Sequence, residues 1–120
     1  MKPHSDSARL RHMLDYAKEA MAMASGRTRA DLDRDRTLNL ALVRLLEVVG
    51  EAAARVSIET RRGSPQVPWA EIVNLRNRLI HGYDSVDFDI LWDIVTEDLP
   101  PLVLKLEPMV ESETSTTGDG

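Results

Sequence analysis

One segment of the chain combines a histidine, two arginines, an asparagine and a tyrosine: Arg76-Asn77-Arg78-Leu79-Ile80-His81-Gly82-Tyr83. RNA is cut without a metal when a base removes the ribose 2′-hydroxyl proton, a cation stabilises the pentacovalent phosphorus, and an acid protonates the leaving oxygen. Histidine suits both proton roles because its ordinary pKa is about 6.5, and arginine suits the charge role through its fork of donors. The residue types in this segment therefore favour metal-independent cleavage of a phosphodiester.

The element that carries the segment decides which of its side chains meet. The spacing of apolar residues predicts that the segment ends an amphipathic helix, which stops at Gly82. On a regular helix Arg76 lies about 140° around the axis from His81, and Asn77 and Arg78 are the neighbours of that histidine instead. Arg76 joins His81 only if the helix unwinds or a second chain supplies the arginine. Because the segment holds a single histidine, a base and acid pair is most easily built across a two-fold homodimer.

The same residues also have a purely structural interpretation. Arginines and a histidine in the last turn of a helix, followed by glycine, complement the negative end of the helix dipole and form an ordinary C-terminal cap. The chain has 12 arginines, so an arginine a few residues before a histidine is also common by chance. The spacing alone leaves both interpretations open.

The charge of the chain is unevenly distributed. Residues 1–81 carry 14 of the 15 Lys and Arg but 10 of the 20 Asp and Glu, a balance of +4. Residues 82–120 carry Lys105 against the other 10 acids, a balance of −9. A chain polarised in this way can present a basic surface to phosphate although its net charge is −5. Solvated helix faces followed by an acidic tail would give the same count.

The composition sets the class of protein. The 120 residues are enough for one domain, and the lack of cysteine excludes disulfides and thiolate metal sites. No apolar run approaches the roughly 20 residues that cross a bilayer, and the first residues lack the apolar core of a secretory signal. We therefore expect a soluble, cytoplasmic protein that does not bind a membrane.

Apolar residues recur at helical spacing along the chain, and no segment alternates convincingly with period two. The sequence predicts an all-α, four- to five-helix up-and-down bundle over residues 1–110 and a disordered acidic tail over residues 111–120. The expected helices cover residues 5–25, 31–62, 68–82 and a last segment from 85 or 87 onwards.

Glycine and proline mark the boundaries of these helices. Gly26 is expected to end the first helix, and Gly50, inside the second, is expected to mark a close contact with another helix. The fourth helix opens at Ser85 or Asp87, and Pro100-Pro101 must kink or restart it.

Other polar residues are weaker candidates for a site. Glu51, on the edge of the apolar face of the second helix, is a candidate for orienting Arg76 or Arg78 through an ion pair, and equally a surface acid. His4 and His12 have no carboxylates around them at metal-ligand spacing. The acids between residues 31 and 35 alternate with arginines, which is typical of a salt-bridged helix start. The sequence indicates no metal site and no cofactor.

Helices three and four carry a resemblance to a known family. The stretch from Pro68 to Tyr83, followed by Val86–Trp92 and by Asp98-Leu99-Pro100-Pro101-Leu102, resembles the HepT family of HEPN-domain ribonuclease toxins. The resemblance extends to residues 45–51 in the second helix. The pattern Arg-x4-His-x-Tyr of this family is matched by three residues without substitution: Arg76, His81 and Tyr83.

The resemblance implies a homodimeric, HEPN-like helical ribonuclease that needs no metal, with a composite site at the dimer cleft. Arg76 and His81 would be catalytic, and Asn77 would assist as a polar group. The resemblance also implies an antitoxin partner, a minimal nucleotidyltransferase similar to MntA, which transfers AMP onto Tyr83. A bulky, charged group there would block the entry of RNA.

Three functions follow as hypotheses. The first is an endoribonuclease toxin of a type VII-like toxin–antitoxin pair, which cleaves RNA. The second is a non-catalytic helical module that binds a minimal nucleotidyltransferase partner or RNA. In the third, the nucleotidyltransferase is the active partner and this chain is its substrate or helper. The sequence does not name the RNA.

Overall fold

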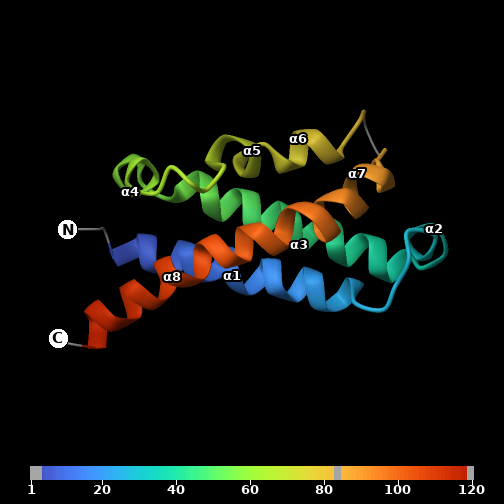
Figure 1. Cartoon of the computed structure of the whole chain (residues 1–120). Helices are drawn as coiled ribbons and strands as arrows, with labels where there is room; N and C mark the ends of the chain where they lie inside the picture. Colours follow the sequence, from blue (N-terminus) through green and yellow to red (C-terminus); the bar gives the residue numbers. More distant parts are fainter. Residues whose placement is uncertain (1–3, 83–84, 119–120) are drawn as a thin grey trace.

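Three long helices lie side by side and carry most of the core (Figure 1). They are α1 (His4–Ala24), α3 (Arg36–Arg55) and α8 (Leu99–Gly118), and α1 packs against both of the others. The computed structural model describes residues 4–82 and 85–118. Shorter elements connect and cover the long helices: α2 (Asp31–Arg34), α4 (Ile58–Gly63), α5 (Trp69–Val73), α6 (Leu75–Leu79), α7 (Phe88–Asp93) and η1 (Ile94–Asp98).

The core forms where the apolar faces of these helices meet. Each leucine that is fully buried contributes about 1.5–3 kcal/mol relative to an exposed one, and such residues come from α1, α3, α7, η1 and α8 alike. The all-α bundle predicted from the sequence is confirmed. The large side chains that are fully buried in these elements are Leu10, Met13, Leu42, Leu46, Val49, Leu91, Ile94, Leu99 and Leu106.

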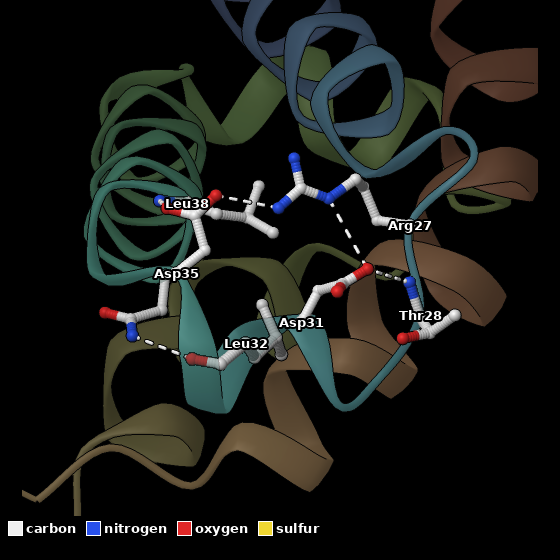
Figure 2. A network of polar contacts seen from close by, with 7 residues as sticks. Arg27, Thr28, Asp31, Leu32, Asp35 and Leu38 are labelled. Carbon is white, nitrogen blue, oxygen red and sulfur yellow. Dashed lines mark hydrogen bonds and ion pairs between the residues drawn. The ribbon is translucent and has the colours of Figure 1, made fainter.

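The turn from α1 into α2 begins where the sequence predicted it. Gly26 has φ = +76°, a conformation that residues with a side chain rarely adopt, and it follows the last turn of α1. At the far side of the turn, the backbone N–H of Thr28 donates to Asp31 Oδ2 at 2.7 Å (Figure 2). This hydrogen bond, helped by the charge of Arg27, lowers the pKa of Asp31.

The prediction of one helix over residues 31–62 is wrong at its start. Asp35 leaves the helical conformation, with φ = −113° and ψ = 95°, and its Oδ1 accepts a hydrogen bond from the N–H of Leu38 at 3.0 Å. Asp35 thus separates α2 from α3 as the N-cap of α3. Arg27 Nη2 donates to Asp35 Oδ2 at 2.7 Å, which lowers the pKa of Asp35 and raises that of Arg27 (Figure 2).

The same predicted helix breaks a second time, after Arg55. Val56 is extended, and Ser57 caps α4 by accepting from the N–H of Thr60 at 3.2 Å. The buried carboxylate of Asp6 in α1 holds this break in place, because it accepts from both the N–H and the hydroxyl of Ser57, at 3.0 and 2.7 Å. The contact of Ser57 with Asp6 of α1 therefore helps to end α3 at a point where the spacing of apolar residues predicted that the helix would continue.

The predicted helix over residues 68–82 is divided into α5 and α6. Asn74, with φ = −92° and ψ = 9°, separates them. The close contact expected at Gly50 is confirmed: a Cβ atom there would lie 3.0 Å from the backbone oxygen of Ile72. The backbone of α5 therefore rests directly on α3, and this contact fixes the start of the segment that carries the motif.

The C-terminal half is nearly continuous helix. Asp87 caps α7, and its Oδ1 accepts from the N–H of Ile90 at 3.0 Å. The interruption expected at Pro100-Pro101 lies just before them, as the π-helical turn η1, in which the N–H of Leu99 donates to the oxygen of Ile94. Proline lacks an N–H and presses on the carbonyl one turn earlier, and a wider turn relieves both problems.

The end of the chain differs from the prediction. We expected no regular structure after residue 110, but α8 continues to Gly118. Met109 and Val110 are buried and attach the helix to the core, and no glycine or proline follows before Gly118. Among the described residues, no helix combines the length and the apolar character needed to cross a membrane.

Candidate active site

The helix that carries the motif ends earlier than predicted, at Leu79. Ile80 is extended, with φ = −102° and ψ = 117°, and forms an isolated antiparallel bridge with Val86. The N–H of His81 donates to the oxygen of Ser85 at 2.7 Å, and Gly82 turns the chain with φ = +85°. The expectation that His81 belongs to the last turn of a regular helix is therefore wrong, because the bridge draws it into a tight reversal of the chain.

This reversal places His81 beside Asp87, the N-cap residue of α7. His81 Nε2 lies 3.8 Å from Asp87 Oδ2, and 56% of the histidine side chain is exposed. The second oxygen of this carboxylate, Oδ1, caps α7. Asp87 is thus held by the helix while its second oxygen faces the imidazole, an arrangement that orients the ring of His81.

Arg76 projects from α6 beside a pocket on the surface of α3. Its Nε lies 3.7 Å from Glu47 Oε2, and 72% of its side chain is exposed. The pocket has a volume of about 240 Å³, and its lining includes the guanidinium of Arg76 and the amide of Asn77. It is lined by Glu47, Gly50, Glu51, Ala54, Val73, Arg76 and Asn77.

Glu51 does not form the ion pair that the sequence suggested. It lines the pocket, but its carboxylate lies 3.7 Å from Nη1 of Arg44, about two turns earlier on its own helix. Glu47 takes the expected role toward Arg76, because it stands one turn earlier on the same face of α3. Glu47 was not named from the sequence, because the position of α6 on α3 decides which of the two acids faces Arg76.

The other two polar residues of the motif have local partners. Asn77 Nδ2 donates to Asn74 Oδ1 at 2.7 Å, close to the break between α5 and α6. Arg78 Nη2 donates to Asp98 Oδ2 at 3.3 Å, which ties α6 to the π-helical turn. Arg78 is therefore bound to the C-terminal half, whereas Arg76 is turned toward α3.

The motif thus forms two half-sites in one chain, an imidazole with a carboxylate and a guanidinium beside a pocket. Among the described residues, no hydrogen bond or ion pair joins Arg76 to His81. Tyr83, the predicted modification site, lies outside the described residues. Sequence reasoning named Asp87 only as a helix start, and its position facing His81 depends on a chain reversal that the helical pattern did not indicate.

Neither half-site gathers ligands for a metal. Within residues 5–82 and 85–112, whose side chains are described, no three His, Asp or Glu side chains come together in a way that would hold a metal ion. The groups that face solvent at the two half-sites are an acid–base side chain and a permanent cation, which together suit proton transfer and charge stabilisation at a phosphate.

The chain was compared with known proteins. It is 33% identical over 107 residues to "Putative RNase MJ1380" of Methanocaldococcus jannaschii, covering 89% of this chain and 98% of that one. It is 39% identical over 75 residues to "Probable ribonuclease HepT" of Thermococcus cleftensis (62% and 68%). It is 32% identical over 104 residues to "Putative RNase TTE0752" of Caldanaerobacter subterraneus (87% and 93%).

No solved structure matches the chain at a comparable level. A family model described as "Ribonuclease HepT-like" matches residues 13–109, which span all the described elements from the middle of α1 to the last buried turns of α8. The family model covers most of this chain, and the chain matches two relatives named as RNases over nearly their whole length. The chain therefore belongs to the ribonuclease HepT-like family and is an endoribonuclease.

Proposed function

We propose that this endoribonuclease cuts RNA with Arg76 and His81, in a site completed by a second copy of the chain, and that it acts as the toxin of a toxin–antitoxin pair. The observation that carries the proposal is the position of His81. It leaves the helix, stands exposed beside a carboxylate, and belongs to the same short segment as an exposed arginine at a pocket.

The reaction assigns a role to each group. One His81 removes the proton of a ribose 2′-hydroxyl, and the 2′-oxygen attacks the adjacent phosphorus. Arg76 stabilises the negative charge that develops on the phosphoryl oxygens. The bond from phosphorus to the 5′-oxygen breaks, and a protonated His81 from the second copy gives that oxygen its proton. The products are a 2′,3′-cyclic phosphate and a 5′-hydroxyl, and no metal takes part.

The roles of His81 and Arg76 are tested by RNA cleavage. His81→Ala should slow cleavage by about 100-fold or more, because general acid–base catalysis contributes about that factor. Arg76→Ala should lose a similar amount through unstabilised charge. The control is Arg34→Ala, which removes an equal charge from α2 and lines neither the Arg76 pocket nor the contact of His81 with Asp87. Wild-type rates in both motif variants, measured by gel with mapping of the cyclic phosphate ends, would sink the proposal.

A mixing experiment tests whether the site is composite. Wild-type chain and His81→Ala are mixed in equal amounts, unfolded together and refolded, so that about a quarter of the dimers carry two copies of His81 and about half carry one. If one site needs His81 from both copies, only the dimers with two are active, and about a quarter of the wild-type activity remains. If each copy forms a complete site by itself, about half of the activity remains. Light scattering that finds only monomers would exclude the dimer altogether.

The proposed control of the enzyme is a modification of Tyr83, which follows His81 by two residues. The phenol oxygen attacks the α-phosphorus of ATP, pyrophosphate leaves, and the phenolic proton passes to solvent, so that AMP is joined through a phosphodiester. A minimal nucleotidyltransferase would supply this activity as the antitoxin. The added negative charge and bulk, two residues from His81 along the chain, would oppose the approach of RNA.

Growth and mass measurements test this control. Induced wild-type chain should slow growth, and co-expression of a cognate minimal nucleotidyltransferase should restore it. After incubation with that enzyme and ATP, the chain should gain the mass of one adenylyl group, and Tyr83→Phe should gain none. If the purified dimer binds the nucleotidyltransferase but cuts no RNA, the chain is a binding module instead of a nuclease.

A further inference from the structure

A second pocket lies between α1 and α3 and is lined by none of the residues of the motif. It has a volume of about 190 Å³, and its polar lining consists of two arginines, a histidine and a glutamate from two helices that pack along their length. The function proposed above uses none of these side chains for chemistry. The residues that line it are Arg9, His12, Val48, Glu51, Ala52 and Arg55.

The pocket carries a net positive charge. Arg9 and Arg55 bring two permanent cations, against the single carboxylate of Glu51, which also lies within 3.7 Å of Arg44. The Nε of Arg9 is buried and has no hydrogen-bond partner among the described residues. A buried donor without an acceptor costs stability, so Arg9 has unused capacity to bind an oxygen that a ligand brings.

An aromatic surface stands at the edge of the pocket. The ring of His12, which lines the pocket, stacks on Tyr16 one turn later, with ring centroids 6.1 Å apart and planes inclined by 16°. The side chain of His12 is exposed, so one face of this stack is accessible. Cations that hold phosphates beside aromatic faces that stack bases are the combination with which proteins bind single-stranded nucleic acid.

The pocket adjoins the Arg76 pocket across one side chain. Glu51 lines both, from the side of α3 that lies between α1 and the α5–α6 segment. A strand whose scissile phosphate is held at Arg76 would therefore reach the second pocket with a neighbouring phosphate. The carboxylate between them repels phosphate but accepts a hydrogen bond from a ribose hydroxyl.

We propose that the pocket of Arg9, His12 and Arg55 is a phosphate-binding subsite that anchors the RNA strand beside the cleavage site, with a base stacked on His12. The inference rests on the proposed function in taking RNA as the substrate. It adds the part of the chain, α1 and the end of α3, that holds the strand without taking part in the reaction.

Binding is measured with a probe that cannot be cleaved, a fluorescent single strand of about 12 nucleotides with 2′-O-methyl groups throughout. Arg55→Gln should weaken binding at least about fivefold and lower the slope of log affinity against log salt by about 0.7 for the lost phosphate contact. Arg9→Gln with Arg55→Gln should lower both further. The control is Arg34→Gln, which removes the same charge and should leave both quantities unchanged.

The stacked base is tested at His12. His12→Ala should weaken binding of the same probe by about fivefold or more, the usual loss when an aromatic stacking partner is removed. His12→Phe keeps the aromatic face and should restore most of the affinity. Equal losses in both variants would mean that the ring nitrogens, and not the face, make the contact, which would overturn the stacking part of the proposal.

Two results would overturn the subsite as a whole. The first is wild-type affinity and salt slope in Arg55→Gln. Arg55 is exposed, so this variant is expected to fold even if Arg9→Gln does not, and thermal melting checks that it is folded. The second is tight binding of ATP that depends on Arg55 while RNA binding does not, which would mark a mononucleotide site.

The outcome is separable from that of the proposed function. Because the probe is not cut, its binding depends on neither Arg76 nor His81 as catalysts. Normal RNA cleavage by His81→Ala would refute the proposed catalytic role of His81, and the binding of the probe by the subsite variants would still test the subsite. Conversely, if Arg55→Gln binds the probe as the wild type does while His81→Ala does not cleave RNA, the subsite is refuted and the proposed chemistry stands.

Discussion

At the scale of residues, the carboxylate of Asp87 serves two partners with its two oxygens. Oδ1 accepts from the N–H of Ile90 and caps α7, while Oδ2 lies 3.8 Å from His81 Nε2. The first contact fixes the side chain, so the second is available without further loss of conformational freedom. A helix cap thereby becomes a positioning group for the histidine.

Substitution separates these two roles of Asp87. Asp87→Asn keeps the cap, because asparagine caps helices as well as aspartate does, but removes the charge that faces His81. We expect kcat for RNA cleavage to fall about tenfold, with KM and the melting temperature nearly unchanged. Asp87→Ala should show the same loss of kcat and also lose about 1 kcal/mol of stability. Full kcat in Asp87→Asn would reduce this residue to a cap.

The glycine under the motif segment gives a prediction about stability. A Cβ at position 50 would lie 3.0 Å from the backbone oxygen of Ile72, and backbone yields less easily than a side chain. Gly50→Ala should therefore destabilise the fold by about 1 kcal/mol or more, measured by urea unfolding. Gly63→Ala, in α4 with no atom near its Cβ position, is the matched control and should be neutral or slightly stabilising.

At the scale of elements, the sequence predicted where the apolar faces lie but not where the helices break. Apolar residues lie on both sides of Asp35 and of Ser57, so residues 31–62 resemble one helix. Both breaks depend on polar side chains that cap a new helix, and Ser57 is held by Asp6, far away in the chain. Capping residues were visible in the sequence, but which of them would cap was not.

The candidate site shows the same division. Arg76 and His81 were identified from the sequence, because residue types and the resemblance to a family are local properties. Their partners Glu47 and Asp87 were not, because these depend on how α6 lies on α3 and on a chain reversal after Leu79. The spacing of apolar residues predicts a helix but does not predict the residue at which it ends.

The corner between α2 and α3 makes stability depend on pH. Hydrogen bonds from Arg27 and from backbone N–H groups lower the pKa of Asp35 and Asp31 in the folded state. Their contribution is complete above the unfolded pKa of about 3.9 and is lost as the pH falls below it, through the depressed values. Asp35→Ala should therefore lower the melting temperature at pH 7 but make little difference at pH 2. An equal difference at both pH values would contradict this.

At the scale of the whole molecule, the acidic segment of residues 82–120 folds back onto part of the basic segment of residues 1–81. Arg29 pairs with Asp89 at 2.7 Å, and Arg78 pairs with Asp98 at 3.3 Å. The arginines of the two pockets are not used in this way. The charge separation along the sequence therefore leaves one cationic pocket, that of Arg9 and Arg55, on a protein whose net charge is −5.

The chemistry of the whole enzyme predicts indifference to metal removal. Cleavage of an unstructured RNA should proceed at the same rate after treatment with EDTA and after readdition of magnesium, because in the proposed mechanism His81 and Arg76 supply proton transfer and charge stabilisation. Initial rates of wild-type enzyme under both conditions measure this. Loss of activity in EDTA that magnesium restores would require a different mechanism.

The placement of the two chain ends has a practical consequence for studying this enzyme. α1 begins and α8 ends at the same end of the bundle, whereas α6 ends towards the other end, where α2 lies (Figure 1). A purification tag, a fluorophore or a second protein joined at either end would thus be attached at a distance from the end of α6, which His81 follows by two residues. The bundle acts as a spacer, and linkers for surface immobilisation can be short.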